Sequence, residues 1–249
     1  MTSTTDSHML SLKAAAMLAA LIGGAALLLV DGLIVVETPF GVPFLGGSIA
    51  AYVVAAILTV SRIGAEDPNA RFGLANALTW TRLVLVCVFA GVVAATATVR
   101  LSLSANAWWF FFGLATAALI LDGCDGFVAR RHGTASSFGG RFDMEVDAFF
   151  ILLLSILIFT IDKAGPWVLL SGALRYLYVI AGWVFPLLAE PIPAHWRRKF
   201  IAAVQGAALT ALLAPIVEPP LSVWTAAIAL ALLVYSFGTD VIWLMRKTS

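Results

Sequence analysis

Cysteine and histidine are scarce in this chain of 249 residues. The two cysteines, Cys87 and Cys124, both lie inside apolar runs, so we predict neither a disulfide framework nor a thiolate metal site. The three histidines, His8, His132 and His195, are far apart in the sequence, and none has a partner at metal-ligand spacing. We interpret all three as solvated side chains.

Charged residues are scarce as well, at 12% of the chain against 61% hydrophobic residues. This balance excludes an ordinary water-soluble domain and predicts an all-α polytopic protein in a lipid bilayer. The net charge of +1 gives no indication of a nucleic-acid partner, and we expect none.

Apolar runs of membrane-spanning length predict about eight spans. They cover residues 12–36, 44–60, 83–99, 109–129, 142–161, 166–188, 200–217 and 221–245. A signal peptide is the rival interpretation of the first run, but that run is longer than a signal h-region and no small-residue cleavage site ends it. Residues 1–8 are polar and are predicted to be disordered.

The first two spans carry no chemical motif and are predicted to form an accessory hairpin that turns at residues 38–43. Residues 61–82 then change to a polar, amphipathic character, with Asp67-Pro68 as a helix breaker. We expect a short interfacial helix over residues 69–78 that leads into the third span.

Basic residues predict the orientation of these spans. With the N-terminus inside, twelve of the fifteen basic residues lie at the cytoplasmic side of the membrane. The exceptions are Arg100, Lys163 and Arg175. The opposite orientation would invert this ratio and break the positive-inside rule. We therefore predict a protein of a bacterial-type inner (cytoplasmic) membrane whose acidic motif faces the cytoplasm.

Four acids form that motif between the fourth and fifth spans. Asp122 and Asp125 are three residues apart, and Asp143 and Asp147 are four apart, so each pair shares one face of a helix. A turn between the two helices would bring all four carboxylates together. Like charges in a space of low dielectric constant need counter-charge, and hard divalent cations suit oxygen ligands, with Mg²⁺ usual where phosphates take part.

The residues between the acids suit a bulky anionic ligand. Gly126 and Gly139 leave the backbone open to close approach, and Arg130 offers a planar set of donors for phosphate. The alternative is a pair of membrane helices whose acids line an ion path or pair with Arg130 and Arg141. Such a protein would be a membrane cation transporter or ion-binding protein, although a cation path has no use for Arg130 at its mouth.

The order of these residues, D-x2-D-G-x2-A-R-x8-G-x3-D-x3-D over residues 122–147, resembles the signature of the CDP-alcohol phosphotransferases, also called CDP-alcohol phosphatidyltransferases. Every fixed position matches, spacing included. The resemblance implies a six-helix catalytic core over about residues 75–245 and a homodimer. We accordingly predict an N-terminal tail and hairpin at residues 1–62, followed by one structural unit at residues 63–249 that contains the interfacial helix and the core.

The resemblance also implies the reaction. A metal-dependent transferase of phospholipid synthesis would move a phosphatidyl group from a CDP-linked lipid, most simply CDP-diacylglycerol, to an alcohol and release CMP. A pair of Mg²⁺ or Mn²⁺ ions would be held by Asp122, Asp125, Asp143 and Asp147, and Asp147 would also be the catalytic base. Donor-binding positions would be Gly126, Ala129, Arg130, Ser136 and Gly139.

Residues 75–82, ANALTWTR, resemble the N-x-x-T-x-x-R run that precedes the first core helix in the family and helps to hold the cytidine diphosphate. Asn76, Thr79 and Arg82 fit it, while Ala75 replaces the usual proline. The other interpretation of this run is a helix cap with interface anchors.

A basic pocket of Arg175, Arg197, Arg198 and Lys199 would suit an acceptor that carries phosphate, of the glycerol phosphate or inositol phosphate type. Lys199 to Gln205 also resembles the K-x-x-T-x-x-Q of glycerophosphate-using members, with Ala202 in place of threonine. Positive-inside anchoring is the alternative interpretation of residues 197–199, and choline or serine remain open as acceptors.

Overall fold

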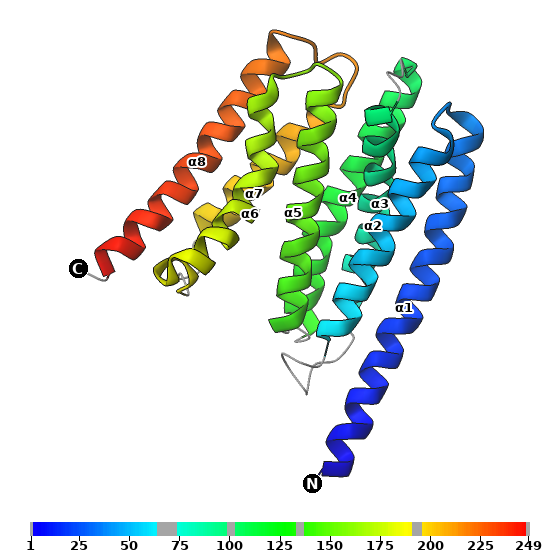
Figure 1. Cartoon of the computed structure of the whole chain (residues 1–249), viewed down its shortest axis with the longest axis vertical. Helices are drawn as coiled ribbons and strands as arrows, with labels where there is room; N and C mark the ends of the chain where they lie inside the picture. The colour runs from blue at the N-terminus through cyan, green and yellow to red at the C-terminus, as the bar shows by residue number, and fades with distance from the viewer. Residues whose placement is uncertain (1, 64–73, 99–102, 133–136, 191–195, 248–249) are drawn as a thin grey trace. The chain divides into compact units, whose positions relative to one another are not determined.

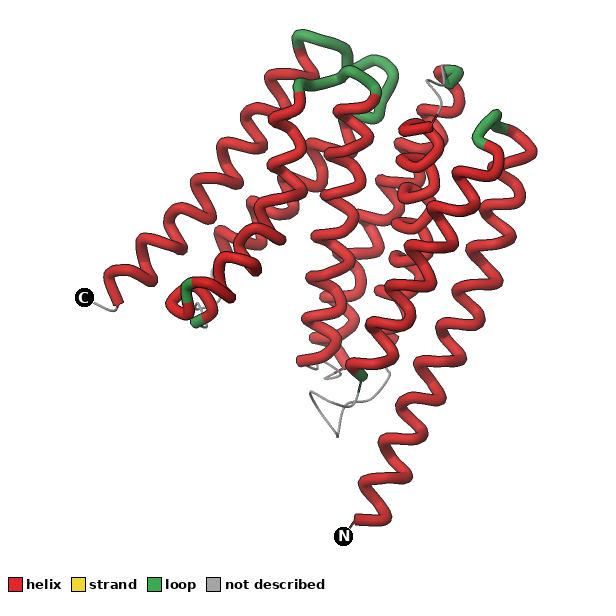
Figure 2. Tube along the Cα trace, viewed as in Figure 1, coloured by secondary structure: helices red, strands yellow, loops and turns green. Residues whose placement is uncertain are grey.

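The computed structural model describes residues 2–63, 74–98, 103–132, 137–190 and 196–247, and the described residues are helical with no strand (Figure 2). The α-helices are α1 Thr2–Glu37, α2 Gly41–Arg62, α3 Leu74–Thr98, α4 Ala105–His132, α5 Ser137–Thr160, α6 Leu169–Val184, α7 Trp196–Ala211 and α8 Leu221–Lys247. Short 3-10 turns precede and follow α6, at Pro166–Val168 and Pro186–Ala189. The predicted all-helical fold is confirmed.

Six of these helices have the length and apolar composition to cross a membrane. Their spans are Leu12–Glu37, Gly41–Arg62, Asn76–Thr98, Ala105–Gly123, Pro166–Val184 and Leu221–Lys247. Large apolar side chains are exposed along them, for example Leu21 and Leu29 at 72% each. Exposed apolar surface on this scale suits contact with lipid, so the chain fits an integral membrane protein.

The described structure divides into two compact units. The first comprises residues 1–107 and 113–150, and the second comprises residues 108–112 and 151–249. The first unit therefore holds α1 to α3, most of α4 and the start of α5, which includes all the described acids of the motif. The predicted domain boundary at residue 62 stays a prediction, because compactness alone does not define a domain.

The N-terminal hairpin belongs to the first unit. Helices α1 and α2 run antiparallel, in blue to cyan in Figure 1, and the chain reverses between Glu37 and Gly41. Gly41 has φ of +61°, a left-handed conformation that glycine adopts without a steric penalty. Helix α1 already begins at Thr2, so the predicted disorder of residues 1–8 is wrong from that residue onward. Extending an existing helix costs less free energy than nucleating one, which allows the apolar run to carry the helix into the polar segment.

Small residues let α2 approach α3 closely. A Cβ atom added to Gly47 would lie 2.5 Å from the Cβ of Ala94, and one added to Gly91 would lie 2.7 Å from the carbonyl oxygen of Phe44. Contacts between backbones at such glycines are a common means of packing membrane helices. The hairpin therefore packs directly against α3, the helix that also contributes a side chain to the acidic site.

Helix α3 runs unbroken from Leu74 to Thr98. Of the expected interfacial helix, residues 69–73 lie outside the described residues, and residues 74–78 form the first turns of α3. Among the described residues, therefore, no separate interfacial helix is seen between α2 and α3.

In the second unit, α7 ends at Ala211, six residues short of the predicted span. Pro215 disfavours helical backbone at the residue before it, which limits the helix at this end. The Lys163 side chain donates hydrogen bonds to the carbonyl oxygens of Ala214 at 3.5 Å and Val217 at 2.5 Å. These bonds stabilise a non-helical end, and the 16 residues of α7 reach only about 24 Å, less than the ~30 Å of a hydrocarbon core.

Candidate active site

Three aspartates converge inside the first unit. Asp122 lies in α4, whereas Asp143 and Asp147 lie one turn apart in α5. One carboxylate oxygen from each lies within 4.8 Å of the other two. The prediction that two successive helices bring these acids of the motif together is confirmed for these three residues.

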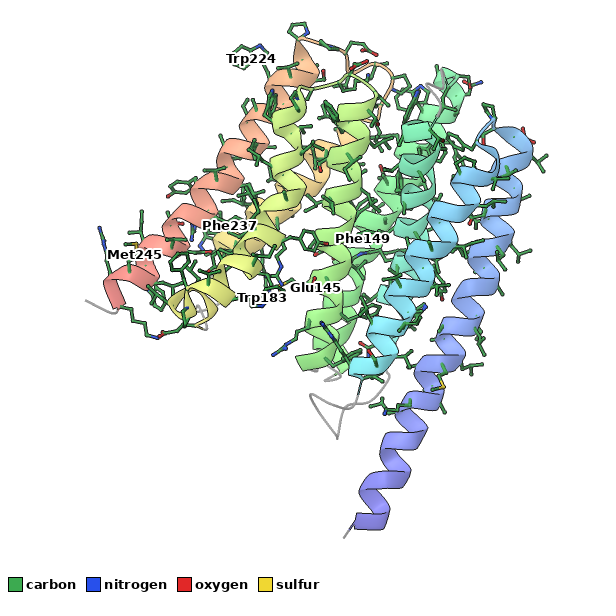
Figure 3. The ribbon with its side chains drawn as sticks, in the orientation of Figure 1. Glu145, Phe149, Trp183, Trp224, Phe237 and Met245 are labelled. Carbon is green, nitrogen blue, oxygen red and sulfur yellow. The ribbon has the colours of Figure 1, made fainter. Side chains whose placement is uncertain are left out.

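The carboxylates remain accessible from outside the protein. The side chains of Asp122 and Asp143 are each 35% exposed, and that of Asp147 is 40% exposed. Glu145, also on α5, is exposed (Figure 3). Since it lies two residues from both Asp143 and Asp147, helical periodicity directs it away from their shared face. The site is therefore a cluster of three acids at a surface that a polar ligand can reach.

Arg82 of α3 contacts all three carboxylates. Its Nη1 atom donates hydrogen bonds to Oδ1 of Asp122 and, at 2.8 Å, to Oδ1 of Asp143. Its Nη2 atom donates to Oδ1 of Asp147. The arginine is only 1% exposed, so the guanidinium lies on the inner side of the cluster and offsets part of its negative charge.

The sequence alone pointed to Arg130 or Arg141 as the alternative partner of the acids. The structure instead puts Arg82 in contact with them, a residue from a different helix and 40 positions before Asp122. The N-x-x-T-x-x-R run did single out Arg82. It did not reveal the ion pairs, because these depend on how α3 packs against α4 and α5.

Asn76 and Thr79 precede Arg82 at intervals of three residues, which places the three along one side of α3. Both are buried, with 6% and 3% of their surface exposed. Aromatic contacts hold this part of α3 against α5, since the ring centroids of Trp80 and Phe142 are 5.5 Å apart. The structure thus places the predicted donor-binding pair of α3 on the helix face that carries Arg82.

The remaining predicted site residues of the motif are described only in part. Gly139 lies in the first turn of α5. Side chains of residues 124–137, which include Asp125, Ala129, Arg130 and Ser136, lie outside the described residues, although residues 124–132 fall within the bounds of α4. Gly126 falls within the same part of α4.

The three described acids fit a divalent cation by the chemistry of their donors. Each offers a hard carboxylate oxygen, the three oxygens are close together, and the exposed side of the cluster leaves room for further oxygen ligands from water or phosphate. Asp122, Asp143 and Asp147 are therefore the residues that could hold a metal ion here.

A second polar cluster lies within the second unit. Arg197 of α7 donates a hydrogen bond to Asp240 of α8 at 2.7 Å, and Arg198 Nε lies 3.7 Å from the other oxygen of Asp240. Arg198, Asp240 and Arg175 all act electrostatically on the Tyr178 hydroxyl. The Tyr178 ring packs against Phe237, which Figure 3 labels on α8, at a centroid distance of 5.4 Å.

This cluster contains the predicted acceptor residues Arg175 and Arg198, whereas Lys199 is exposed on α7. Two arginines, Arg197 and Arg198, contact a single acid, so this group keeps a net positive charge. Asp240 lies six residues before Arg246, the first of the cations at the C-terminal end of α8, and nothing in the local sequence indicates its pairing with α7.

In a comparison with protein-family models, residues 72–235 match the family described as CDP-alcohol phosphatidyltransferase. The matched region contains α3 to α7 and the first half of α8, and it begins after the hairpin. It includes the three aspartates and Arg82, and it ends before Asp240 of the second cluster. Comparisons with curated proteins and with solved structures found no match.

Proposed function

Because the chain belongs to the CDP-alcohol phosphatidyltransferase family, we propose that it transfers a phosphatidyl group from CDP-diacylglycerol to a polar alcohol and releases CMP. The family transfers a phosphatidyl group from a CDP-alcohol to an acceptor, and the choice of donor and acceptor is our proposal. The observation that carries it is the convergence of Asp122, Asp143 and Asp147 at an accessible site within the family's signature.

The donor brings a diphosphate, which needs positive charge around it. Asp122, Asp125, Asp143 and Asp147 would hold a pair of Mg²⁺ or Mn²⁺ ions, and bound ions of this kind neutralise the diphosphate and stabilise the departing CMP. Asn76, Thr79, Gly126, Ala129, Arg130, Ser136 and Gly139 would bind the cytidine and phosphate groups. Helix α3 supports this assignment, because it places Asn76 and Thr79 on the side that also carries Arg82.

Asp147 would act as the general base. It is the most exposed of the three described acids and lies one turn further along α5 than Asp143. It would take the proton of the acceptor hydroxyl while that oxygen attacks the phosphorus nearer the lipid. A new P–O bond then forms to the acceptor, the bond to CMP breaks, and the products are a phosphodiester lipid and CMP.

The acceptor is proposed to carry a phosphate, as glycerol phosphate or inositol phosphate does. Arg175, Arg198 and Lys199 would bind that phosphate, and the net positive charge of the arginine cluster around Asp240 supports the assignment. The test is CMP release by the purified protein with CDP-diacylglycerol, Mg²⁺ and a panel of acceptors. Glycerol phosphate or inositol phosphate should stimulate release most, whereas preference for choline or serine would contradict the proposed acceptor class.

The membrane arrangement remains part of the proposal. We propose eight spans, a bacterial-type inner membrane, a cytoplasmic active site and a homodimer, on the distribution of basic residues and on family membership. The alternative of a cation transporter gains no support from the site, since a buried guanidinium among the acids would oppose the passage of cations.

A further inference from the structure

Arg82 forms ion pairs with all three aspartates of this site. Arg82 is 1% exposed, while each of its partners keeps about a third of its side-chain surface open. Its guanidinium donates hydrogen bonds to the Oδ1 atoms of Asp122, Asp143 and Asp147. The guanidinium thus occupies the inner side of the triangle that the three carboxylates form.

A divalent cation bound by the same three acids would need the same space. Mg²⁺ requires its oxygen ligands at about 2.0–2.1 Å, so the three carboxylates would have to turn their oxygens toward one point. The guanidinium now holds one oxygen of each carboxylate. A metal ion at that point would lie against a buried positive charge, and like charges repel strongly where the dielectric constant is low.

We propose that Arg82 is a built-in counter-cation that holds the three aspartates together before metal binding and competes with the divalent cation for them. Metal loading then requires the guanidinium to withdraw from at least part of the cluster. This inference rests on the metal site of the proposed function. Arg82 would position the three aspartates and at the same time oppose metal binding. If Arg82 only supported the site, its removal would weaken metal binding instead.

The test is Mn²⁺ binding to the purified full chain without any substrate, measured from the free-Mn²⁺ signal in electron paramagnetic resonance. Arg82→Gln removes the positive charge and keeps a polar side chain. It should bind Mn²⁺ at least about tenfold more tightly than the wild type, since one competing charge next to a divalent ion is worth at least ~1.4 kcal/mol, or a factor of ten. Arg62→Gln is the matched control, because Arg62 is exposed at the end of α2, and its Mn²⁺ affinity should equal that of the wild type.

Arg82→Lys provides a second variant that keeps a charge inside the cluster and so protects folding. A lysine ammonium cannot span three carboxylates with a planar fork, so Mn²⁺ binding should tighten by a smaller factor, about threefold. Unchanged or weaker Mn²⁺ binding in either folded variant overturns the competition. If neither the wild type nor any variant binds Mn²⁺, the metal site of the proposed function fails as well, which separates the two claims.

Discussion

Tyr52 of the hairpin and Trp80 of α3 are joined by a buried hydrogen bond. The indole Nε1 donates to the Tyr52 hydroxyl at 2.9 Å, and that hydroxyl in turn donates to the carbonyl oxygen of Ala20 in α1 at 2.7 Å. A Cβ atom on Gly23 would lie 2.5 Å from the same hydroxyl, so α1 has no room to shift here. One tyrosine therefore links α1 and α2 to the helix that carries Arg82.

We expect Tyr52→Phe to destabilise the first unit by about 1–2 kcal/mol, because it leaves the buried Trp80 N–H without its acceptor. In a thermal unfolding experiment followed by tryptophan fluorescence, the apparent Tm should fall by roughly 2–8 °C. Tyr235→Phe on the exposed face of α8 serves as the control and should leave the Tm unchanged. An equal shift in both variants would show that the bond to Trp80 does not stabilise the hairpin.

Asp31 of α1 is fully buried, and neither of its oxygens has a hydrogen-bond partner among the described residues. Ser48 of α2 lies beside it. Asparagine carries no charge, so Asp31→Asn avoids an uncompensated charge at this buried position. Its amide N–H can also donate to the Ser48 hydroxyl. The variant should therefore gain about 1–3 kcal/mol of stability, measured as a higher apparent Tm. A lower Tm would indicate that the carboxyl group itself stabilises the hairpin.

The sequence predicted the helices and most of the acidic site because both depend on local periodicity. Spacings of three and four residues placed Asp122, Asp143 and Asp147 on helix faces, and the long apolar runs located every helix. What the sequence could not supply are contacts between distant helices. The reach of Arg82 into the acids requires α3 to pack against α5, through rings such as Trp80 and Phe142, and no local pattern encodes that packing.

The ends of the helices were predicted less well for the same reason. Apolar residues continue beyond Ala211, so hydropathy extended α7 to Val217. The actual end is stabilised by Lys163, which reaches the carbonyl oxygens of Ala214 and Val217 from a loop about 50 residues earlier. Such a contact is visible only in three dimensions.

The cytoplasmic orientation of the motif can be tested by cysteine labelling. A cysteine at position 133, in a background without Cys87 and Cys124, should resist a membrane-impermeant maleimide applied to the periplasmic side of intact cells. It should react once inverted membrane vesicles expose the cytoplasmic side. Efficient labelling of intact cells would overturn the predicted topology, which rests on the distribution of basic residues.

Asp147 and Asp122 are proposed to have different roles, general base and metal ligand, and substitutions can distinguish the two. Asp147→Asn keeps one oxygen ligand but removes the basic lone pair, so CMP release should fall by ~10²-fold or more, as expected for loss of a general base. Binding of CDP-diacylglycerol with Mg²⁺ should survive in this variant. Asp122→Asn should weaken both donor binding and catalysis. If Asp147→Asn lost donor binding as severely as Asp122→Asn, Asp147 would be chiefly a metal ligand.

Metal-dependent catalysis at the aspartate cluster is tested most directly by comparing CMP release from CDP-diacylglycerol, at increasing Mg²⁺, by the wild type, Asp143→Asn and Glu145→Gln. Asp143 and Glu145 are two residues apart on α5, and only Asp143 belongs to the cluster around Arg82. We predict Mg²⁺-dependent release by the wild type and by Glu145→Gln, and loss of most activity at low Mg²⁺ in Asp143→Asn. Near-normal release by Asp143→Asn at low Mg²⁺, or release by the wild type without any divalent cation, would contradict this prediction.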